Sequence, residues 1–139
     1  MESVNPKNNP RVIVIQKLYG HHLNKDSEIT FPKHRYKKFI KDVVNGTIER
    51  KELIQNLMDK ELKDDINENK TDLMIKLMIM AAIYEFMFMH KTPVKVVIAE
   101  YLKVADAFVE KSRKDFLNAI LDKISKVSRV NNDWIHINK

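Results

Sequence analysis

Residues 71–89, TDLMIKLMIMAAIYEFMFM, form the stretch that decides the fold of this 139-residue chain. Fifteen of the nineteen residues are apolar, and they fall on every side of a 3.6-residue helical wheel. A helix that is apolar all round must be surrounded by other helices. Lys76 and Glu85 interrupt the run, so its longest uncharged piece, residues 77–84, is far shorter than the roughly 20 residues of a membrane span. We therefore predict the central helix of an all-α domain that does not cross a membrane.

The ends of this central helix are predicted from its flanking residues. Asn69 or Thr71 is expected as the N-cap, which places Asp72 in the first turn, where the helix dipole favours an acid. Pro93 disfavours helical backbone at the residue before it. We expect the helix to end between residues 89 and 91. Lys76 and Glu85 are expected to pair with neighbouring side chains, as a structural and not a catalytic feature.

Composition limits the class of protein. A chain of 139 residues is the size of one domain, and we predict a single domain over residues 1–139. The absence of cysteine excludes disulfides, thiolate metal sites and a cysteine nucleophile, and it suits a reducing, cytoplasmic compartment. The first ten residues, MESVNPKNNP, contain no apolar segment of a secretory signal. With only two glycines, a phosphate-binding glycine loop is not expected.

The net charge of +6 is unevenly distributed. Residues 1–46 and 90–139 are basic, whereas residues 47–89 carry a small excess of acid. A nucleic acid would therefore meet surfaces formed by the N-terminal third and the C-terminal helices. A lysine-rich solvated surface with no such partner explains the same charges, and the sequence alone leaves both interpretations open.

Five further helices are expected around the central one. The first covers residues 11–23, although the β-branched run at 12–15 would suit a strand equally well. Pro32 is expected to open the second, in which Gly46 either ends the helix or allows a neighbour to approach closely. The third spans the apolar positions of residues 53–62.

Two more helices follow the central one. Thr92 is predicted as the N-cap of the fifth, with Pro93 at its first position. The spacing of Ser112 and Asp115 predicts a capping box at the start of the sixth. The last ten residues are expected to be frayed, and Trp134 among them is either packed back on the domain or exposed.

Several segments resemble the NusB family of transcription antitermination factors. The pattern YEF…TPVKVVIAEYLKVADAF…KDFLNAILDKI, residues 84–124, matches the family's YEL…P…VAINE…ELAK.F…KFVNGVLDK. The segment QKLYGHHL at residues 16–23 resembles the family's Q-A-L-Y, and Val44-Asn45-Gly46 resembles its L-x-G-V turn. The resemblance spans nearly the whole chain. It implies an all-helical NusB-like fold of two small helical bundles that share the long central helix.

The resemblance also implies a function. The family binds single-stranded boxA RNA together with a small-subunit ribosomal protein that acts as NusE, within the RNA polymerase antitermination complex. RNA contacts of the family come from an arginine-rich N-terminal arm and from the start of the last helix. Tyr19 matches the family tyrosine near the ribosomal-protein interface. The expected RNA-binding residues, carried over by position, are Lys7, Arg11, Arg113, Lys114, Phe116 and Asn118.

The chain departs from the family pattern mainly in its cations. Only two of the four basic arm positions stay charged, Asn8 and Asn9 occupying the others, and an aspartate, Asp115, replaces the lysine before Phe116. These changes predict weaker RNA binding without a change of fold.

Alternatives stay open for two of the site residues and for the function. Phe116 is either a stacking platform for a base or a core residue, and Tyr19 is either a partner contact or a packing residue. The second functional hypothesis is a NusB-like protein-interaction module, or a homodimer, with little intrinsic RNA binding. The sequence shows no nucleophile motif and no metal-ligand spacing among its five histidines, so we expect no enzyme activity, metal or cofactor.

Overall fold

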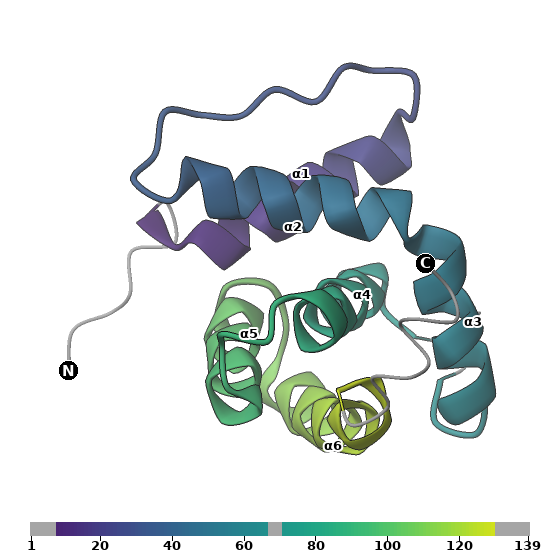
Figure 1. Cartoon of the computed structure of the whole chain (residues 1–139). Coiled ribbons are helices and arrows are strands. Elements are labelled where there is room, and N and C mark those ends of the chain that lie inside the picture. The colour runs from purple at the N-terminus through teal and green to yellow at the C-terminus, as the bar shows by residue number, and fades with distance from the viewer. Residues whose placement is uncertain (1–7, 67–70, 130–139) are drawn as a thin grey trace, which may run out of the picture.

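The computed structural model describes residues 8–66 and 71–129. Within these residues the chain is helical, and no strand is present. The six helices are α1 Pro10–Leu23, α2 Lys37–Glu49, α3 Lys51–Glu61, α4 Leu73–Phe88, α5 Val94–Phe108 and α6 Lys111–Ser128 (Figure 1). The run at residues 12–15 is helical, because burial in a helical bundle decides a local preference that was ambiguous. None of the helices in the described part is long and apolar enough to cross a membrane.

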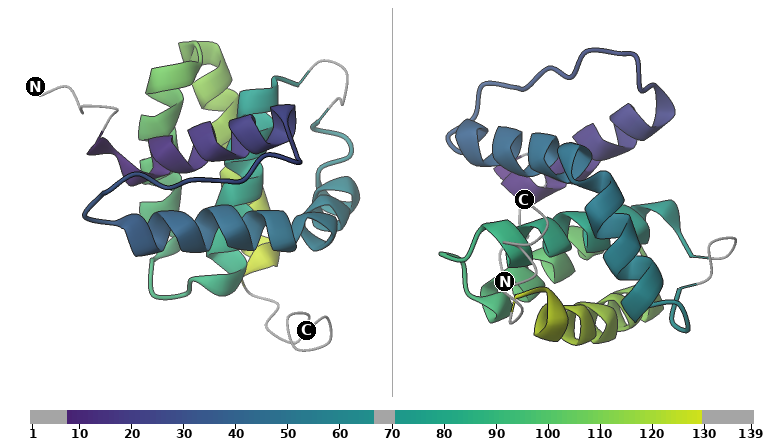
Figure 2. Two further views of the ribbon diagram at one scale, coloured as in Figure 1. Left: turned by 90° about the horizontal axis from the view of Figure 1, so that it is seen from above. Right: turned by 45° about the vertical axis from the view of Figure 1, so that its right-hand side comes forward.

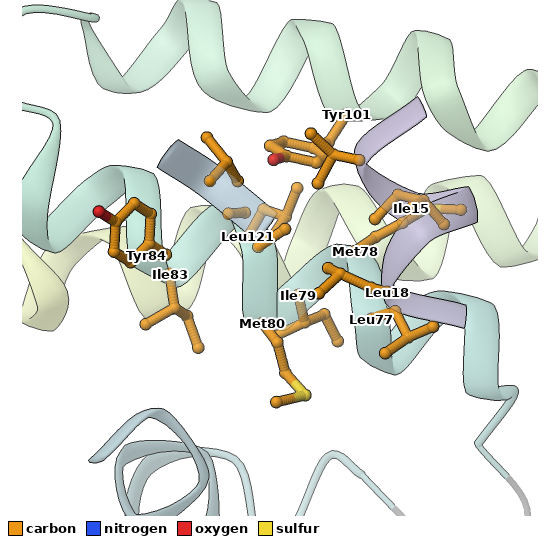
Figure 3. Close-up of a cluster of buried hydrophobic side chains, with 14 of the residues drawn as sticks. Ile15, Leu18, Leu77, Met78, Ile79, Met80, Ile83, Tyr84, Tyr101 and Leu121 are labelled. Atoms are coloured by element: carbon orange, nitrogen blue, oxygen red, sulfur yellow. The ribbon is translucent and has the colours of Figure 1, made fainter. Parts of the chain in front are cut away.

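Helix α4 is the centre of the molecule, as its sequence predicts. Twelve of its sixteen residues are buried, and it packs against each of the other five helices. Helices α1 to α3 cover one side of it and α5 and α6 the other, which gives two small bundles with α4 in common (Figure 1). The buried side chains of α4 meet Ile15 and Leu18 from α1, Tyr101 from α5 and Leu121 from α6 (Figure 3). The predicted architecture is therefore confirmed.

The arrangement of the other helices determines which surfaces of the molecule are exposed. Seen from above, α1 lies across the middle of the molecule, with α2 alongside it and the α5–α6 turn projecting on its other side (Figure 2). Helices α1 and α2 begin at the same end, because the connection of residues 24–36 runs back along the length of α1 (Figure 2).

The start of α4 differs from the prediction. Its N-cap is Asp72, whose carboxylate accepts a hydrogen bond of 2.7 Å from the Met74 backbone N–H. Thr71 is therefore not the cap, and Asn69 lies outside the described residues. The helix ends at Phe88, with Met89 as its C-cap, close to the predicted end. Aspartate is a stronger N-cap than threonine, which explains the shift by one residue.

Helix α2 begins at Lys37 and not at Pro32. Residues 34–37 form a turn in which the Lys37 N–H donates to the His34 carbonyl and the Tyr36 N–H donates to His34 Nδ1. This local bonding competes with helix and delays its start. The same helix continues past Gly46, where an added Cβ would lie about 2.1 Å from Cζ of Tyr84. Gly46 therefore permits a close approach and does not end the helix.

The two predicted caps in the C-terminal half are wrong. Pro93 has extended backbone and is itself the N-cap of α5, so Thr92 does not cap that helix. Glu110 is the N-cap of α6, and its carbonyl accepts from the N–H groups of Arg113 and Lys114. Ser112 is consequently the second residue of the helix and not its cap.

Candidate nucleic-acid interface

Arg11, predicted as an RNA contact, is a buried residue of α1. Its side chain is 11% exposed, and that of its partner Glu85, in the middle of α4, is fully buried. Nε of Arg11 donates to one carboxylate oxygen at 3.0 Å, and Nη2 donates to the other at 2.6 Å. The guanidinium also lies over the ring of Phe39 from α2, at 4.7 Å from its centroid. Arg11 therefore joins three helices.

Tyr101 of α5 completes this buried network. Its hydroxyl donates to Glu85 at 2.5 Å, so the carboxylate is bound by a cation and a phenol. Burial and the adjacent carboxylate raise the pKa of Tyr101 well above its usual value. Burial lowers the pKa of Arg11, but the hydrogen bond and the charge of Glu85 outweigh it, and the pKa is raised. The expected pairing of Glu85 is confirmed, and the engaged guanidinium argues against a phosphate contact by Arg11.

A second arginine, Arg129, is also used inside the fold. Its guanidinium donates to four backbone carbonyls at the end of α4 and in the turn after it, those of Glu85, Phe86, Met89 and Thr92. A cation satisfying the last carbonyls of a helix stabilises that helix end. Burial lowers the pKa of Arg129. Arg11 and Arg129, two of the cations that contribute to the basic charge of the chain ends, are thus engaged in contacts within the fold.

The other predicted RNA-binding residues gather at the start of α6. Arg113 and Asn118 are exposed. Lys114 is half-buried and forms an ion pair of 2.9 Å with Asp106 of α5. Phe116 is half-buried and packs against the hydrophobic core at its edge. Phe116 is thus neither a fully buried core residue nor a free side chain, and part of its ring is accessible. Lys7 lies outside the described residues, and so does Trp134.

Tyr19, the predicted partner contact, lies on the outer face of α1. It is 38% exposed, and Leu23, one turn further on, is 65% exposed. A pocket of about 210 Å³ opens beside this face, between the end of α1, the α2–α3 junction and the start of α4. Leu18, Leu77 and Met80 contribute apolar lining, and two histidines and three lysines, including Lys51, also line the pocket. This corner of the molecule offers apolar surface that a protein partner could cover.

One basic surface was missed when the chain was compared with the family pattern. The residues before and in the first turns of α2 include five exposed cations and an exposed tyrosine. Their signal was present in the sequence as the run KHRYKK at residues 33–38, within a segment of net charge +3.

The part of the chain that the structure describes holds no group of three or more histidines or acids placed to bind a metal.

The comparisons with known proteins agree with this architecture. The model of the NusB family matches residues 8–126. A transcription antitermination protein NusB from Rhodopseudomonas palustris strain BisB5 is 33% identical over 91 residues, which cover 66% of this chain and 52% of that protein. One from Mesorhizobium japonicum is 28% identical over 89 residues, covering 64% of this chain and 57% of the relative. The chain thus spans about half the length of the curated relatives it matches.

A solved structure supports the fold independently. The structure of T. maritima NusB superimposes with a TM-score of 0.74, at 23% sequence identity, over 88% of this chain and 92% of the other. At this identity the likeness establishes the fold alone. The family match extends over most of the chain, from residue 8 to residue 126, and the chain therefore belongs to the NusB family.

Proposed function

We propose that this protein acts in transcription antitermination and binds a boxA-type single-stranded RNA together with a small-subunit ribosomal protein of the NusE type. The observation that carries the proposal is the start of α6, where exposed Arg113 and Asn118 lie on one helix with half-buried Phe116, in a chain of the NusB family. The complex would assemble with RNA polymerase in the cytoplasm.

The chemistry of these residues suits single-stranded RNA. Such RNA is held by cations along its backbone and by aromatic rings on which unstacked bases lie. Arg113 supplies an exposed cation, and Phe116 supplies a half-buried aromatic ring. In the ion pair between Lys114 and Asp106, the lysine side chain is 33% exposed and the aspartate side chain is 61% exposed. Such an exposed pair contributes little to stability, so Lys114 can exchange Asp106 for a phosphate.

The protein partner is assigned to the C-terminal end of α1. Tyr19 and Leu23 form an exposed pair one turn apart, next to the apolar pocket at the end of that helix. An aromatic ring beside an apolar pocket is a frequent anchor in protein interfaces. RNA and ribosomal protein would then occupy different surfaces, and each could bind without displacing the other.

The test is RNA binding across a salt series, with and without the ribosomal protein. Each phosphate neutralised on a single strand adds about −0.7 to the slope of log affinity against log salt. Lys7, Arg113 and Lys114 together predict a slope of roughly −2 for this site. The partner should raise RNA affinity by about 1–3 kcal/mol, and RNA should raise partner affinity equally.

Variants of the α6 start localise the site. Arg113→Ala should reduce the slope by about 0.7, whereas Lys126→Ala, an exposed lysine at the other end of α6, should leave it unchanged. Phe116→Ala should cost about 1–3 kcal/mol of RNA binding if the ring stacks a base. A stability loss of about 3–5 kcal/mol with unchanged RNA affinity would instead assign Phe116 to the core.

The second candidate function is a protein-interaction module, or a homodimer. It is favoured by the internal use of Arg11 and by the exposed Tyr19 and Leu23. No detectable RNA binding even with saturating ribosomal protein would establish it in place of the RNA-binding proposal. Sedimentation of the protein alone then distinguishes a homodimer from a module that binds another protein.

A further inference from the structure

The connection into α2 and the first turns of that helix form a basic surface outside the RNA site carried over from the family. We call it the α2 ridge, defined by Lys33, Arg35, Tyr36, Lys37, Lys38 and Lys41. All six residues are exposed. Within residues 8–66 and 71–129, none of the five cations forms an ion pair with a carboxylate. Their charge is therefore available to an external anion.

Aromatic rings lie among these cations. Tyr36 is 48% exposed, and the guanidinium of Arg35 lies 5.4 Å from the centroid of its ring. Nζ of Lys41 lies 5.9 Å from the ring centroid of Phe31. Cations beside an accessible aromatic ring are the arrangement that binds single-stranded nucleic acid, since the ring stacks a base while the cations contact phosphates.

The ridge is held in a fixed place by His34. Nδ1 of His34 accepts a hydrogen bond of 2.9 Å from the Tyr36 backbone N–H, so its Nε2 carries the proton and donates to the Asn8 carbonyl at 3.1 Å. Asn8 directly precedes Asn9, the N-cap of α1. The hydrogen bond thus places the ridge beside the start of α1, where the described part of the chain begins.

A shallow groove of about 540 Å³ continues from the ridge along α2. Lys38, Lys41 and Asn45 line it at helical spacing, and the ring of Tyr84 from α4 forms its far wall. Two acids also border the groove, Asp42 and Glu49. Asp42 accepts a hydrogen bond of 2.8 Å from the Tyr84 hydroxyl, so part of its capacity as an acceptor is already used.

We propose that the α2 ridge is a second RNA-binding surface, on which lysines of α2 contact the backbone of the same single strand and Tyr36 stacks one base. This inference rests on the proposed RNA-binding function and adds contacts to it. It accounts for a chain that has lost cations from its arm and uses Arg11 and Arg129 inside the fold. The ridge supplies the missing charge from a neighbouring segment.

The slope of log affinity against log salt separates RNA binding that includes the α2 ridge from RNA binding that does not. The α6 start and Lys7 alone predict a slope of roughly −2, whereas three additional lysine contacts predict roughly −4. The triple variant Lys37→Ala/Lys38→Ala/Lys41→Ala should return the slope to roughly −2 and lower RNA affinity about 100-fold at 0.1 M salt. The matched control, Lys60→Ala/Lys63→Ala/Lys126→Ala, removes the same charge from three exposed lysines outside the surfaces proposed to bind RNA or the protein partner. It should change the slope by much less than one.

The aromatic contact has its own test. Tyr36→Ala should lower RNA affinity about tenfold or more, and Tyr36→Phe should retain it, because the ring and not the hydroxyl stacks a base. His34→Leu keeps all five cations but removes both hydrogen bonds of the imidazole, and it should weaken RNA binding less than the triple variant does. Thermal melting of the triple variant and of both Tyr36 variants should match the parent, since the substituted ridge residues are exposed. His34→Leu loses two hydrogen bonds, so its RNA binding is compared at a temperature where it remains folded.

The outcomes distinguish this inference from the function on which it rests. If the parent protein binds RNA, Arg113→Ala weakens this binding and the ridge variant binds RNA like the matched control, the role of the α2 ridge is overturned and the proposed function stands. If the ridge variant loses affinity for the ribosomal protein and not for RNA, the ridge binds protein and the inference is again overturned. Absence of RNA binding by the parent under all conditions overturns both.

Discussion

Replacement of Arg11 by methionine tests whether this arginine stabilises the core or binds RNA. Methionine keeps most of the apolar length of the side chain and removes the guanidinium. The carboxylate of Glu85, fully buried, would retain only the hydrogen bond from the Tyr101 hydroxyl. Stranding one member of a buried ion pair costs about 3–5 kcal/mol. For a domain of this size, the midpoint of thermal unfolding should fall by about 10–20 °C.

Urea unfolding followed by circular dichroism measures this loss, and a double-mutant cycle assigns it to the pair. Arg11→Met and Glu85→Gln should each destabilise the domain, since each leaves a buried charge unpaired. The double variant should be more stable than the sum of the two losses predicts, by about 2–3 kcal/mol. Additive losses would mean that the two side chains do not interact as the structure places them.

RNA binding provides the refuting measurement. At a temperature where Arg11→Met remains folded, its salt slope should equal that of the parent, because the guanidinium contacts no phosphate. The interpretation would be refuted if the free energy of unfolding of Arg11→Met lay within about 1 kcal/mol of the parent value and its salt slope were reduced by about 0.7. Arg11 would then leave the core and bind RNA.

Three further predictions concern the packing around α4. Gly46→Ala should destabilise the domain by about 1–3 kcal/mol, because the added methyl group collides with the ring of Tyr84. Gly20→Ala, whose methyl group enters open space, should stabilise the domain by about 0.5–1 kcal/mol. Equal effects of the two variants in urea unfolding would contradict the close approach of Tyr84 to Gly46. The raised pKa of Tyr101 means that its neutral form is favoured in the folded state, so stability should be complete below pH 10 and fall at higher pH. Tyr101→Phe should reduce this alkaline loss by about 1.4 kcal/mol per pH unit, and an unchanged pH profile would exclude the role of Tyr101. Ile83→Asp buries an unpaired charge at a fully buried position and should lower stability by several kcal/mol; melting within a degree or two of the parent would refute the central position of α4.

The sequence determined the architecture because the decisive signal was local and strong. Fifteen apolar residues between positions 71 and 89 lie on all sides of a helix, and Lys76 and Glu85 interrupt them, which together indicate a helix enclosed by other helices. The number of helices followed from apolar periodicity, which depends on side-chain chemistry and survives errors at helix ends. Those ends were less predictable, since the choice between Thr71 and Asp72, or between Thr92 and Pro93, rests on differences in capping energy of about 1 kcal/mol or less.

The candidate site depended much more on tertiary structure. Lys and Arg look alike to a count of charge, whether they face solvent or the core. Arg11 and Arg129 were counted with the surface cations, and only the positions of Glu85 and of the last carbonyls of α4 show that both guanidinium groups are used internally. These partners lie 74 and about 40 residues away in the sequence, so no local pattern could reveal them.

The position of the α2 ridge was decided in the same way. The basic run at residues 33–38 is evident in the sequence, but its relation to the N-terminal arm depends on the bond from His34 to Asn8 and on the parallel course of α1 and α2. The role of Gly46 likewise required Tyr84, 38 positions later, to be in place. Local chemistry specified which residues form helices, whereas the charges and surfaces available to a partner follow from contacts between residues that only the folded chain brings together.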